Sequence, residues 1–249
     1  MGIKGRLPKE RFGHGMPVHA PFIQNLPVYF RNARFALFQY VTDGERAAEL
    51  LPAVLELTDP PTAVLALIEY PWTTIGPYKE AIQFLVCAHQ GRAVQYVPHI
   101  LVTSDVAMAG GREGYGYPKK IAHIEFVREN EILAGYVERP RGFRICSGMI
   151  RPERPLDPSG LPLLPNVCLR VIPASAGPQL AELIEVGSDV RVKELWAGSG
   201  SCHFTGVSDL DPWHRIPVLQ TLSCAYAVAD FELKEGRVLE AVSSQGLRP

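Results

Sequence analysis

Two adjacent lysines, Lys119 and Lys120, are the residues with the clearest chemical potential in this chain. They end a glycine-rich segment and precede an apolar run, in the sequence GGREGYGYPKKIA of residues 110–122. At neutral pH a lysine with its ordinary pKa of about 10.4 is almost entirely a charged ammonium. Burial and a neighbouring cation both favour the neutral amine. That amine attacks ketones and aldehydes to form a Schiff base, whose iminium accepts the electrons of an adjacent bond. The segment therefore predicts a Schiff-base nucleophile.

The two lysines are not expected to act together. Neighbouring side chains of a β-strand point to opposite faces. If residues 119–127 are extended, Lys119 and Lys120 diverge, and burial of one matters more than repulsion by the other.

The glycines of this segment do not match a phosphate-binding loop. Gly111 and Gly116 have the Walker spacing, but Tyr117 and Pro118 follow where that motif requires Lys and Ser or Thr. The dinucleotide fingerprint also fails, because Lys119 stands where its third glycine belongs. The glycines are instead interpreted as residues that let the backbone turn tightly.

Other chemistries find little support in the sequence. None of the seven histidines forms an HxxxH or HExxH motif, and the five cysteines form no CxxC pair, so no metal site is expected. No G-x-S-x-G motif indicates a serine hydrolase. With 25 basic and 26 acidic residues the net charge is -1, which argues against a nucleic-acid partner. No apolar run is long enough for a membrane helix, and widely spaced cysteines suit a reducing compartment, so we expect a soluble, cytoplasmic protein.

The elements that must position the lysines are predicted to be mostly strands. Short runs rich in Val, Ile, Phe and Tyr alternate with turn residues, a pattern typical of strands. These runs cover residues 34–42, 62–70, 80–88, 98–104, 120–128, 132–139, 143–150, 167–173 and 189–198.

Helical patterns are fewer. One covers residues 44–55 and should end near Leu51 because Pro52 follows. A second covers residues 104–112, with Ser104 or Asp105 as its cap, and the middle of residues 214–231 is a third candidate. The balance favours a mainly β fold (β-rich α+β), cone- or barrel-like, with a few short helices. We expect a single domain over residues 1–249, of which residues 1–29 form an extended N-terminal arm.

The lysine segment resembles the active-site segment of the acetoacetate decarboxylase family, in which a Gly-Arg-Glu lead is followed by aromatic-Pro-Lys-Lys. Further similar segments follow in the family's order, and the resemblance covers roughly residues 28–242. They are YVTDGERAAELLP (40–52), PYKEAIQFLV (77–86), VKELWAGSG (192–200) and IPVLQTLSCAYAVADFEL (216–233).

The resemblance implies a β-rich cone or barrel that assembles as a homo-oligomer and acts on a small keto acid. It implies that Lys119 is the Schiff-base nucleophile, that Lys120 is the neighbour held to perturb the pKa of that nucleophile, and that Glu80 is an active-site glutamate. It also implies that neither a metal nor an organic cofactor is needed. Arg112 and Glu113, in the Gly-Arg-Glu lead, are candidate substrate-binding residues.

Some positions depart from the decarboxylase pattern. By ungapped counting, Ala33 stands at the place of an active-site arginine and Leu65 at the place of a second glutamate. Arg34 or Arg31 replaces the arginine if the alignment shifts. Tyr115 lies at a position that is a pocket residue in relatives with other chemistry.

Three hypotheses follow. The first is decarboxylation of acetoacetate or a related β-keto acid through Lys119. The second, motivated by Ala33 and Leu65, is an aldolase-dehydratase that condenses pyruvate with an aldehyde through the same lysine. The third is a binder of small molecules on the same fold, without turnover.

Overall fold

A computed structural model describes residues 2–22, 26–173 and 180–241 of the chain. Within these ranges the strands join into one sheet, in the order β15-β12-β11-β6-β5-β3-β1-β14-β13-β10-β9-β8, while β2 and β7 pair with β5 and β6, and β4 pairs with β1. The strands are β1 (Val28–Val41), β2 (Glu56–Leu57), β3 (Thr62–Tyr70), β4 (Trp72–Thr73), β5 (Tyr78–His89), β6 (Arg92–Val102), β7 (Lys119–Ile121), β8 (His123–Glu129), β9 (Ile132–Glu138), β10 (Arg144–Pro155), β11 (Asn166–Ile172), β12 (Leu180–Glu185), β13 (Ser188–Phe204), β14 (Gln220–Leu233) and β15 (Arg237–Ala241).

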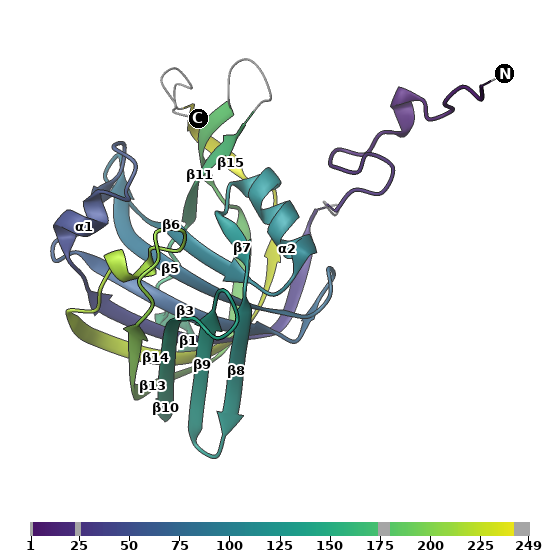
Figure 1. Ribbon diagram of the computed structural model, residues 1–249. Coiled ribbons are helices and arrows are strands. Elements are labelled where there is room, and N and C mark those ends of the chain that lie inside the picture. Colours follow the sequence, from purple (N-terminus) through teal and green to yellow (C-terminus); the bar gives the residue numbers. More distant parts are fainter. Residues whose placement is uncertain (1, 23–25, 174–179, 242–249) are drawn as a thin grey trace.

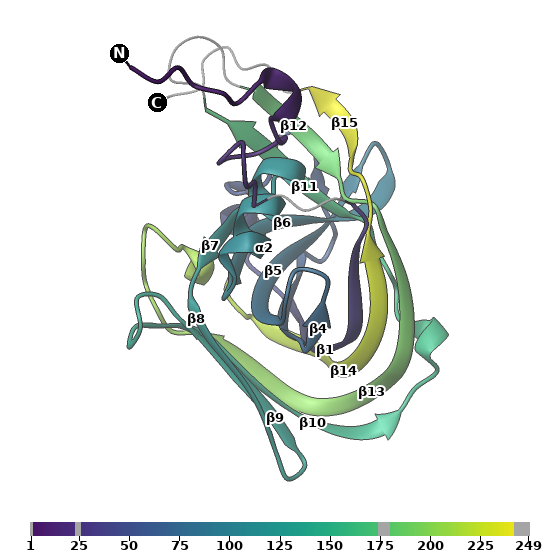
Figure 2. The ribbon, with the colours of Figure 1, turned by 90° about the vertical axis from the view of Figure 1, so that its right-hand side faces the viewer.

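The sheet is strongly curved but does not close. β13 and β14 bend around the inner strands, and the two ends of the sheet, β8 and β15, lie apart (Figure 2). The mainly β fold with few helices is confirmed. The barrel that we also considered is not closed, because within the described residues the strand path ends at β8 on one side and at β15 on the other.

Helices are short, as expected. They are α1 (Gly44–Ala48), α2 (Asp105–Gly110), a π-helical turn η2 (Gly111–Tyr115), and the 3-10 turns η1 (Lys9–Arg11), η3 (Pro158–Gly160) and η4 (Trp213–Arg215). The helix predicted over residues 44–55 exists but is shorter. Ser104 caps α2 as expected, since its hydroxyl accepts a hydrogen bond from the Ala107 N–H at 3.2 Å.

The helix considered within residues 214–231 is wrong. After η4 and a short loop, this segment forms strand β14, which pairs with β1 on one side and β13 on the other. Alanine-rich sequence there favours a helix locally, but two neighbouring strands satisfy the backbone and override that preference.

Each face of the sheet carries a hydrophobic core. On β3, Leu65 and Leu67 belong to one core, whereas Ala66, Ile68 and Tyr70 belong to the other, as period-2 alternation requires. The core that contains Tyr70 is called the cavity-side core, and consists of Val28, Phe30, Ala33, Ala66, Ile68, Tyr70, Tyr78, Ile82, Phe84, Val97, Ile100, Val102, Ala107, Tyr115, Tyr117, Cys168 and Val186. The core that contains Leu65 is called the opposite core.

A crossover from β6 to β7 delivers the lysine segment. The chain leaves β6, passes through α2 and η2 across one end of the sheet, and returns as β7, parallel to β6 (Figure 1). The register pairs Lys119 with Ile100 and Lys120 with Leu101. Ile100 belongs to the cavity-side core and Leu101 to the opposite core, so the two lysines are assigned to different faces.

The N-terminal segment adds no strand to the sheet, whose first strand is β1 at Val28. Residues 2–22 contain η1 and reach out beyond the strands in Figure 1, but His14 and Phe22 of this segment line the cavity described below.

Candidate active site

Lys119 and Glu80 form the centre of the site. The Lys119 Nζ lies 2.8 Å from the Glu80 Oε2, and their side chains are only 8% and 4% exposed. Glu80 reaches this position because β5 pairs it with Val102, the last residue of β6, while β7 adds to the other edge of β6. The Glu80 Oε2 accepts no hydrogen bond of good geometry from the described residues. Its polar contact is the ion pair with the Lys119 Nζ.

Tyr70 holds the other oxygen of Glu80. Its hydroxyl donates a hydrogen bond to the Glu80 Oε1 at 2.8 Å. Burial, followed by the charge of Glu80, raises the pKa of Tyr70 well above its ordinary value, so the phenol stays a donor at physiological pH. A hydrogen bond to a carboxylate is stronger than one between neutral groups. Glu80 is therefore fixed by Tyr70 on one side and faces the amine on the other.

Two aromatic rings surround the amine. The Lys119 Nζ lies 5.2 Å from the ring centre of Tyr117 and 5.9 Å from that of Tyr78. The Tyr117 hydroxyl accepts a hydrogen bond from the Asn166 Nδ2 at 2.9 Å, which fixes the ring. Burial raises the pKa of both phenols well above the ordinary value. Lysine and aromatic rings at these distances attract one another, so the rings help to place the amine.

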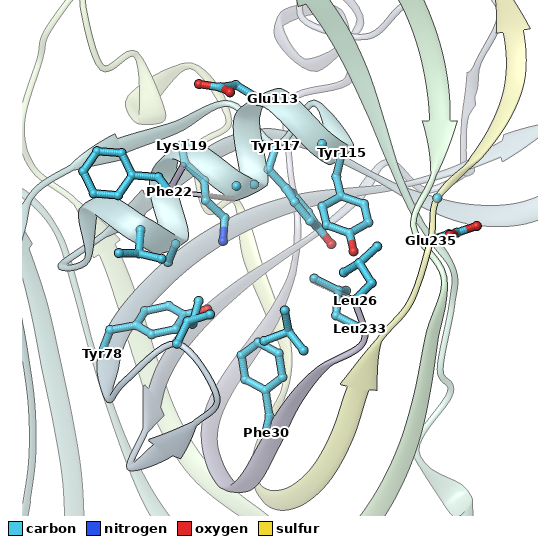
Figure 3. A pocket seen from close by; sticks show the side chains of 18 of the residues that line it. Phe22, Leu26, Phe30, Tyr78, Glu113, Tyr115, Tyr117, Lys119, Leu233 and Glu235 are labelled. Atoms are coloured by element: carbon cyan, nitrogen blue, oxygen red, sulfur yellow. The ribbon is translucent and has the colours of Figure 1, made fainter. Parts of the chain in front are cut away.

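The amine opens into a cavity of about 730 Å³. Figure 3 shows Lys119 pointing from β7 into this space, with Tyr78 and Phe30 on one side and Tyr115 and Tyr117 on the other. The lining residues are His14, Phe22, Leu26, Val28, Phe30, Ile75, Tyr78, Val106, Ala107, Gly110, Gly111, Glu113, Gly114, Tyr115, Tyr117, Lys119, Leu233, Glu235 and Gly236.

Two glycines shape the loop beside the lysine. A Cβ on Gly111 would lie 2.7 Å from the Lys119 Cδ and 2.8 Å from its Cε, so the side chain of Lys119 occupies the space that a larger residue would need. Gly116 has φ of +78° and would place a Cβ 2.6 Å from the Arg170 Cα. Glycine is required at Gly116 both by the left-handed backbone and by this close approach.

Lys120 is held away from the cavity. Its Nζ lies 2.9 Å from the Oδ1 of Asp211 and donates to the carbonyl of Leu210. Arg139 approaches the other oxygen of Asp211 at 3.0 Å, and the carboxylate itself is only 3% exposed. The second lysine therefore ties β7 to the loop before η4, with its charge balanced there.

A known protein family matches most of the chain. The family model described as acetoacetate decarboxylase (ADC) matches residues 15–243. The chain belongs to the acetoacetate decarboxylase family. It is accordingly an enzyme of the lyase class.

Relatives cover nearly the whole chain. The chain is 30% identical over 230 residues to "Acetoacetate decarboxylase 2" of Mesorhizobium japonicum, which spans 90% of this chain and 87% of the relative. It is 29% identical over 238 residues to "Decarboxylase DEC1" of Cochliobolus heterostrophus, with 91% and 94% covered. The solved structure of acetoacetate decarboxylase from Legionella pneumophila has a TM-score of 0.86 at 24% identity, with 97% and 99% covered, and so shares the fold.

Four of the residues predicted for the site of this acetoacetate decarboxylase family member lie together. Lys119, Tyr115 and Glu113 line the cavity, and Glu80 contacts Lys119 from behind. The Tyr115 hydroxyl is already engaged, since it donates to the carbonyl of Lys234 at 2.7 Å, and burial raises the pKa of Tyr115 to about 12.

Three predicted residues lie elsewhere. The side chain of Arg34 is 49% exposed and pairs with Glu69 at 2.8 Å, outside the cavity lining. Arg112 is exposed and its Nη1 donates to the backbone carbonyl of Lys119 at 3.1 Å, so it supports the lysine from outside. Lys120, as described, faces the opposite core. None of the cavity-lining residues that the structure describes is an arginine.

The two departures from the family pattern fall on different faces. Ala33 is fully buried in the cavity-side core, near the site. Leu65 belongs to the opposite core, so it does not face the lysine.

Sequence reasoning missed several residues of the site. Tyr78 precedes Glu80 by two residues in the same strand, so period-2 alternation places it on the same face and is the signal that could have found it. Tyr70 becomes visible only once the β3–β5 pairing brings it opposite Tyr78. Phe22 and Leu26, from the N-terminal segment, also line the cavity, and no local sequence pattern indicates this.

No group of three or more potential metal ligands occurs among the described residues. Within the same residues, no helix is long and apolar enough to cross a membrane.

Proposed function

We propose that this enzyme decarboxylates a β-keto acid through a Schiff base on Lys119. The observation that carries the proposal is the buried Lys119 amine, which lies at a cavity with aromatic walls, 2.8 Å from the carboxylate of Glu80. An amine so placed has a proton acceptor at contact distance and room for a substrate beside it.

The proposed reaction uses these two groups in turn. Glu80 takes the proton of the Lys119 ammonium, and the amine attacks the keto carbon to form a carbinolamine. Glu80 returns the proton to the leaving hydroxyl, so water departs and an iminium forms. The bond to the substrate carboxylate then breaks, its electron pair moves into an enamine, and carbon dioxide leaves. The enamine takes a proton on carbon, and water hydrolyses the iminium to release the ketone and the amine.

The apolar part of the cavity and the named relatives support decarboxylation ahead of aldol condensation. In decarboxylation the substrate carboxylate is lost as neutral carbon dioxide, so an apolar surrounding favours the transition state over the charged ground state. In a condensation of pyruvate the carboxylate persists into the product and gains from a fixed cation. The described lining contains no arginine, a departure that motivates the aldolase-dehydratase as the alternative, so the preference for decarboxylation rests on the two relatives quoted above, both named as decarboxylases.

Trapping with borohydride tests the proposal. Enzyme is incubated separately with acetoacetate and with pyruvate, each with borohydride, and the modified peptide is located by mass mapping. We expect acetoacetate to release carbon dioxide and to leave a reduced adduct on Lys119, and Lys119→Ala to show neither. An unmodified Lys119 with both acids would overturn the proposal.

Two further outcomes separate the alternatives. An unsaturated keto acid formed from pyruvate and an aldehyde, without carbon dioxide from acetoacetate, would establish the aldolase-dehydratase reaction instead. Unchanged ligand affinity in Lys119→Ala, with no turnover in the wild type, would establish the binder.

We also infer that the chain assembles as a homo-oligomer, on the strength of the family likeness. Light scattering on the purified chain, with a mass of 27.5 kDa per subunit, tests the assembly, and a monomer would contradict it.

A further inference from the structure

The size and lining of the cavity point to a substrate larger than acetoacetate. We propose that the enzyme acts on β-keto acids that carry an extended apolar tail on the ketone side. This inference rests on the proposed function, since it names the substrate class of the same lysine.

Volume is the first argument. The cavity measures about 730 Å³. Pockets of about 300–1,000 Å³ bind ligands of drug size, and a single water takes about 30 Å³ in the liquid. A small acid such as acetoacetate, with its carbons beside the Lys119 amine, would leave most of this space to water. Water in an apolar cavity gains few hydrogen bonds, so a ligand that displaces it binds more tightly.

The chemistry of the walls is the second argument. One wall of the cavity is built from aliphatic and aromatic side chains from separate parts of the chain: Phe22, Leu26, Val28, Phe30, Ile75 and Leu233. The ionisable residues of the remaining lining are His14, Glu113 and Glu235. Val28 and Phe30 are buried on β1, and Leu233 ends β14 directly opposite Val28 in the sheet register. These side chains offer nothing to a polar substituent, and they match an alkyl tail.

The placement of the walls gives the tail a direction. In Figure 3 the Lys119 amine points into the middle of the hollow, while Leu26 and Leu233 lie beside Tyr115, on the side away from Tyr78. The Tyr115 hydroxyl is turned to the Lys234 carbonyl, which leaves its ring as an apolar surface. A substrate bound to Lys119 by its keto carbon therefore extends its tail from the amine toward Leu26 and Leu233.

The reaction is unchanged by the tail and its atoms balance. The acid R–CO–CH₂–COO⁻ takes up one proton, loses carbon dioxide by cleavage of the bond to the carboxylate, and leaves as the methyl ketone R–CO–CH₃. The water lost when the iminium forms returns when it is hydrolysed, so no other reactant is needed.

Turnover of a homologous series tests the inference. The wild type is assayed for carbon dioxide release from acetoacetate, 3-oxohexanoate, 3-oxooctanoate and 3-oxodecanoate. A fully buried methylene is worth about fourfold in kcat/KM, and 3-oxodecanoate has six more methylenes than acetoacetate. Even about half of that factor for each methylene would let the longest acid exceed acetoacetate about a hundredfold. A kcat/KM that is flat or falls along the series, with acetoacetate still decarboxylated, would overturn the tail while leaving the proposed function intact.

A substitution in the tail region provides the matched test. Leu233→Trp fills the space near the end of β14 and should lower kcat/KM for 3-oxodecanoate at least about tenfold more than for acetoacetate. Leu222→Trp is the control, since Leu222 lies on the same strand, is 46% exposed and does not line the cavity. If Leu233→Trp lowers kcat/KM equally for 3-oxodecanoate and acetoacetate, the substrate tail does not lie against Leu233.

Trapping of ketones keeps the two proposals distinguishable. If no acid releases carbon dioxide, the proposed function fails. Borohydride trapping of acetone, 2-heptanone and 2-nonanone on Lys119 then decides the tail independently of decarboxylation. Half-maximal trapping at lower concentration for the longer ketones would support the apolar pocket, and no dependence on length would overturn it.

Discussion

Lys119 and Lys120 are neighbours in the sequence, yet their amines make contacts on opposite faces of β7. The Lys119 Nζ contacts Glu80 at 2.8 Å, whereas the Lys120 Nζ contacts Asp211 at 2.9 Å. The pairing of β7 with β6 causes this, because it sets Lys119 beside Ile100 of the cavity-side core and Lys120 beside Leu101 of the opposite core. The positive charge of Lys120 is therefore neutralised locally rather than directed at the nucleophile.

This arrangement predicts that Lys120→Met keeps the pH profile of kcat/KM nearly unchanged. Asp211 stays paired with Arg139, so the charge balance around the loop is partly retained, although the protein should lose about 1–3 kcal/mol of stability. The pH profile of kcat/KM and the free energy of unfolding in urea are both measured for the wild type and for Lys120→Met. A displacement of the acid limb by several pH units would show that the neighbouring charge acts on the nucleophile after all.

The strand that carries this lysine pair shows which features local sequence patterns could predict. Alternation alone predicted that Lys119 and Lys120 diverge, and the structure confirms it. The Ser104 cap was also readable, since a hydroxyl before an apolar turn is a local signal. Both features depend on residues within a few positions of one another.

Features that depend on residues distant in the sequence could not be predicted from it. β14 reads locally as a possible helix, and only its place between β1 and β13 makes it a strand. The partner of Lys120, Asp211, lies more than ninety positions away in a loop without a motif, and Arg34 is drawn to Glu69 by strand register. Tyr70 likewise meets Glu80 only through the pairing of β3 with β5.

Tyr70→Phe should lower kcat/KM about 10- to 100-fold with little change in the fold. The substitution keeps the ring and removes the one hydroxyl that donates to the Glu80 Oε1, and a hydrogen bond to a charged group contributes about 1.5–3 kcal/mol. Steady-state decarboxylation of the best β-keto acid is the measurement.

Tyr78→Phe is the matched control for that experiment. It removes the same atom from a neighbouring ring that also lies near the amine, at 5.9 Å from the Lys119 Nζ. If both variants lose activity equally, the hydrogen bond from Tyr70 to Glu80 has no special role.

Gly111→Ala should remove most activity while the chain still folds. The added methyl group would come within 2.8 Å of the Lys119 Cε, so the flexible side chain must move and carry its amine away from Glu80. Gly114→Ala serves as the comparison, since a Cβ there meets nothing within 4 Å. Borohydride trapping on Lys119 reads the effect directly, and normal trapping in Gly111→Ala would contradict it.

His99 predicts how stability depends on pH. The ring stacks on Trp213 at 5.7 Å, and its Nδ1 donates to the Gln83 Oε1 at 2.8 Å. Burial first, then the charges of Lys120 and His214, lower the pKa of His99 to about 3, while Asp211 opposes that shift.

In the unfolded chain the pKa of His99 is about 6.5. Between about pH 6.5 and pH 3 the unfolded chain therefore binds a proton at His99, whereas the folded protein does not. The contribution of His99 is fully present above pH 6.5 and is lost as the pH falls, by about 2 kcal/mol between pH 7 and pH 5. His99→Gln should be less stable at pH 7, because the stacking is lost, but should lose less on acidification. Urea unfolding at both pH values measures this, with His203→Gln, an exposed histidine on β13, as the control. A wild type and His99→Gln that lose stability in parallel would show that His99 is not the group that titrates.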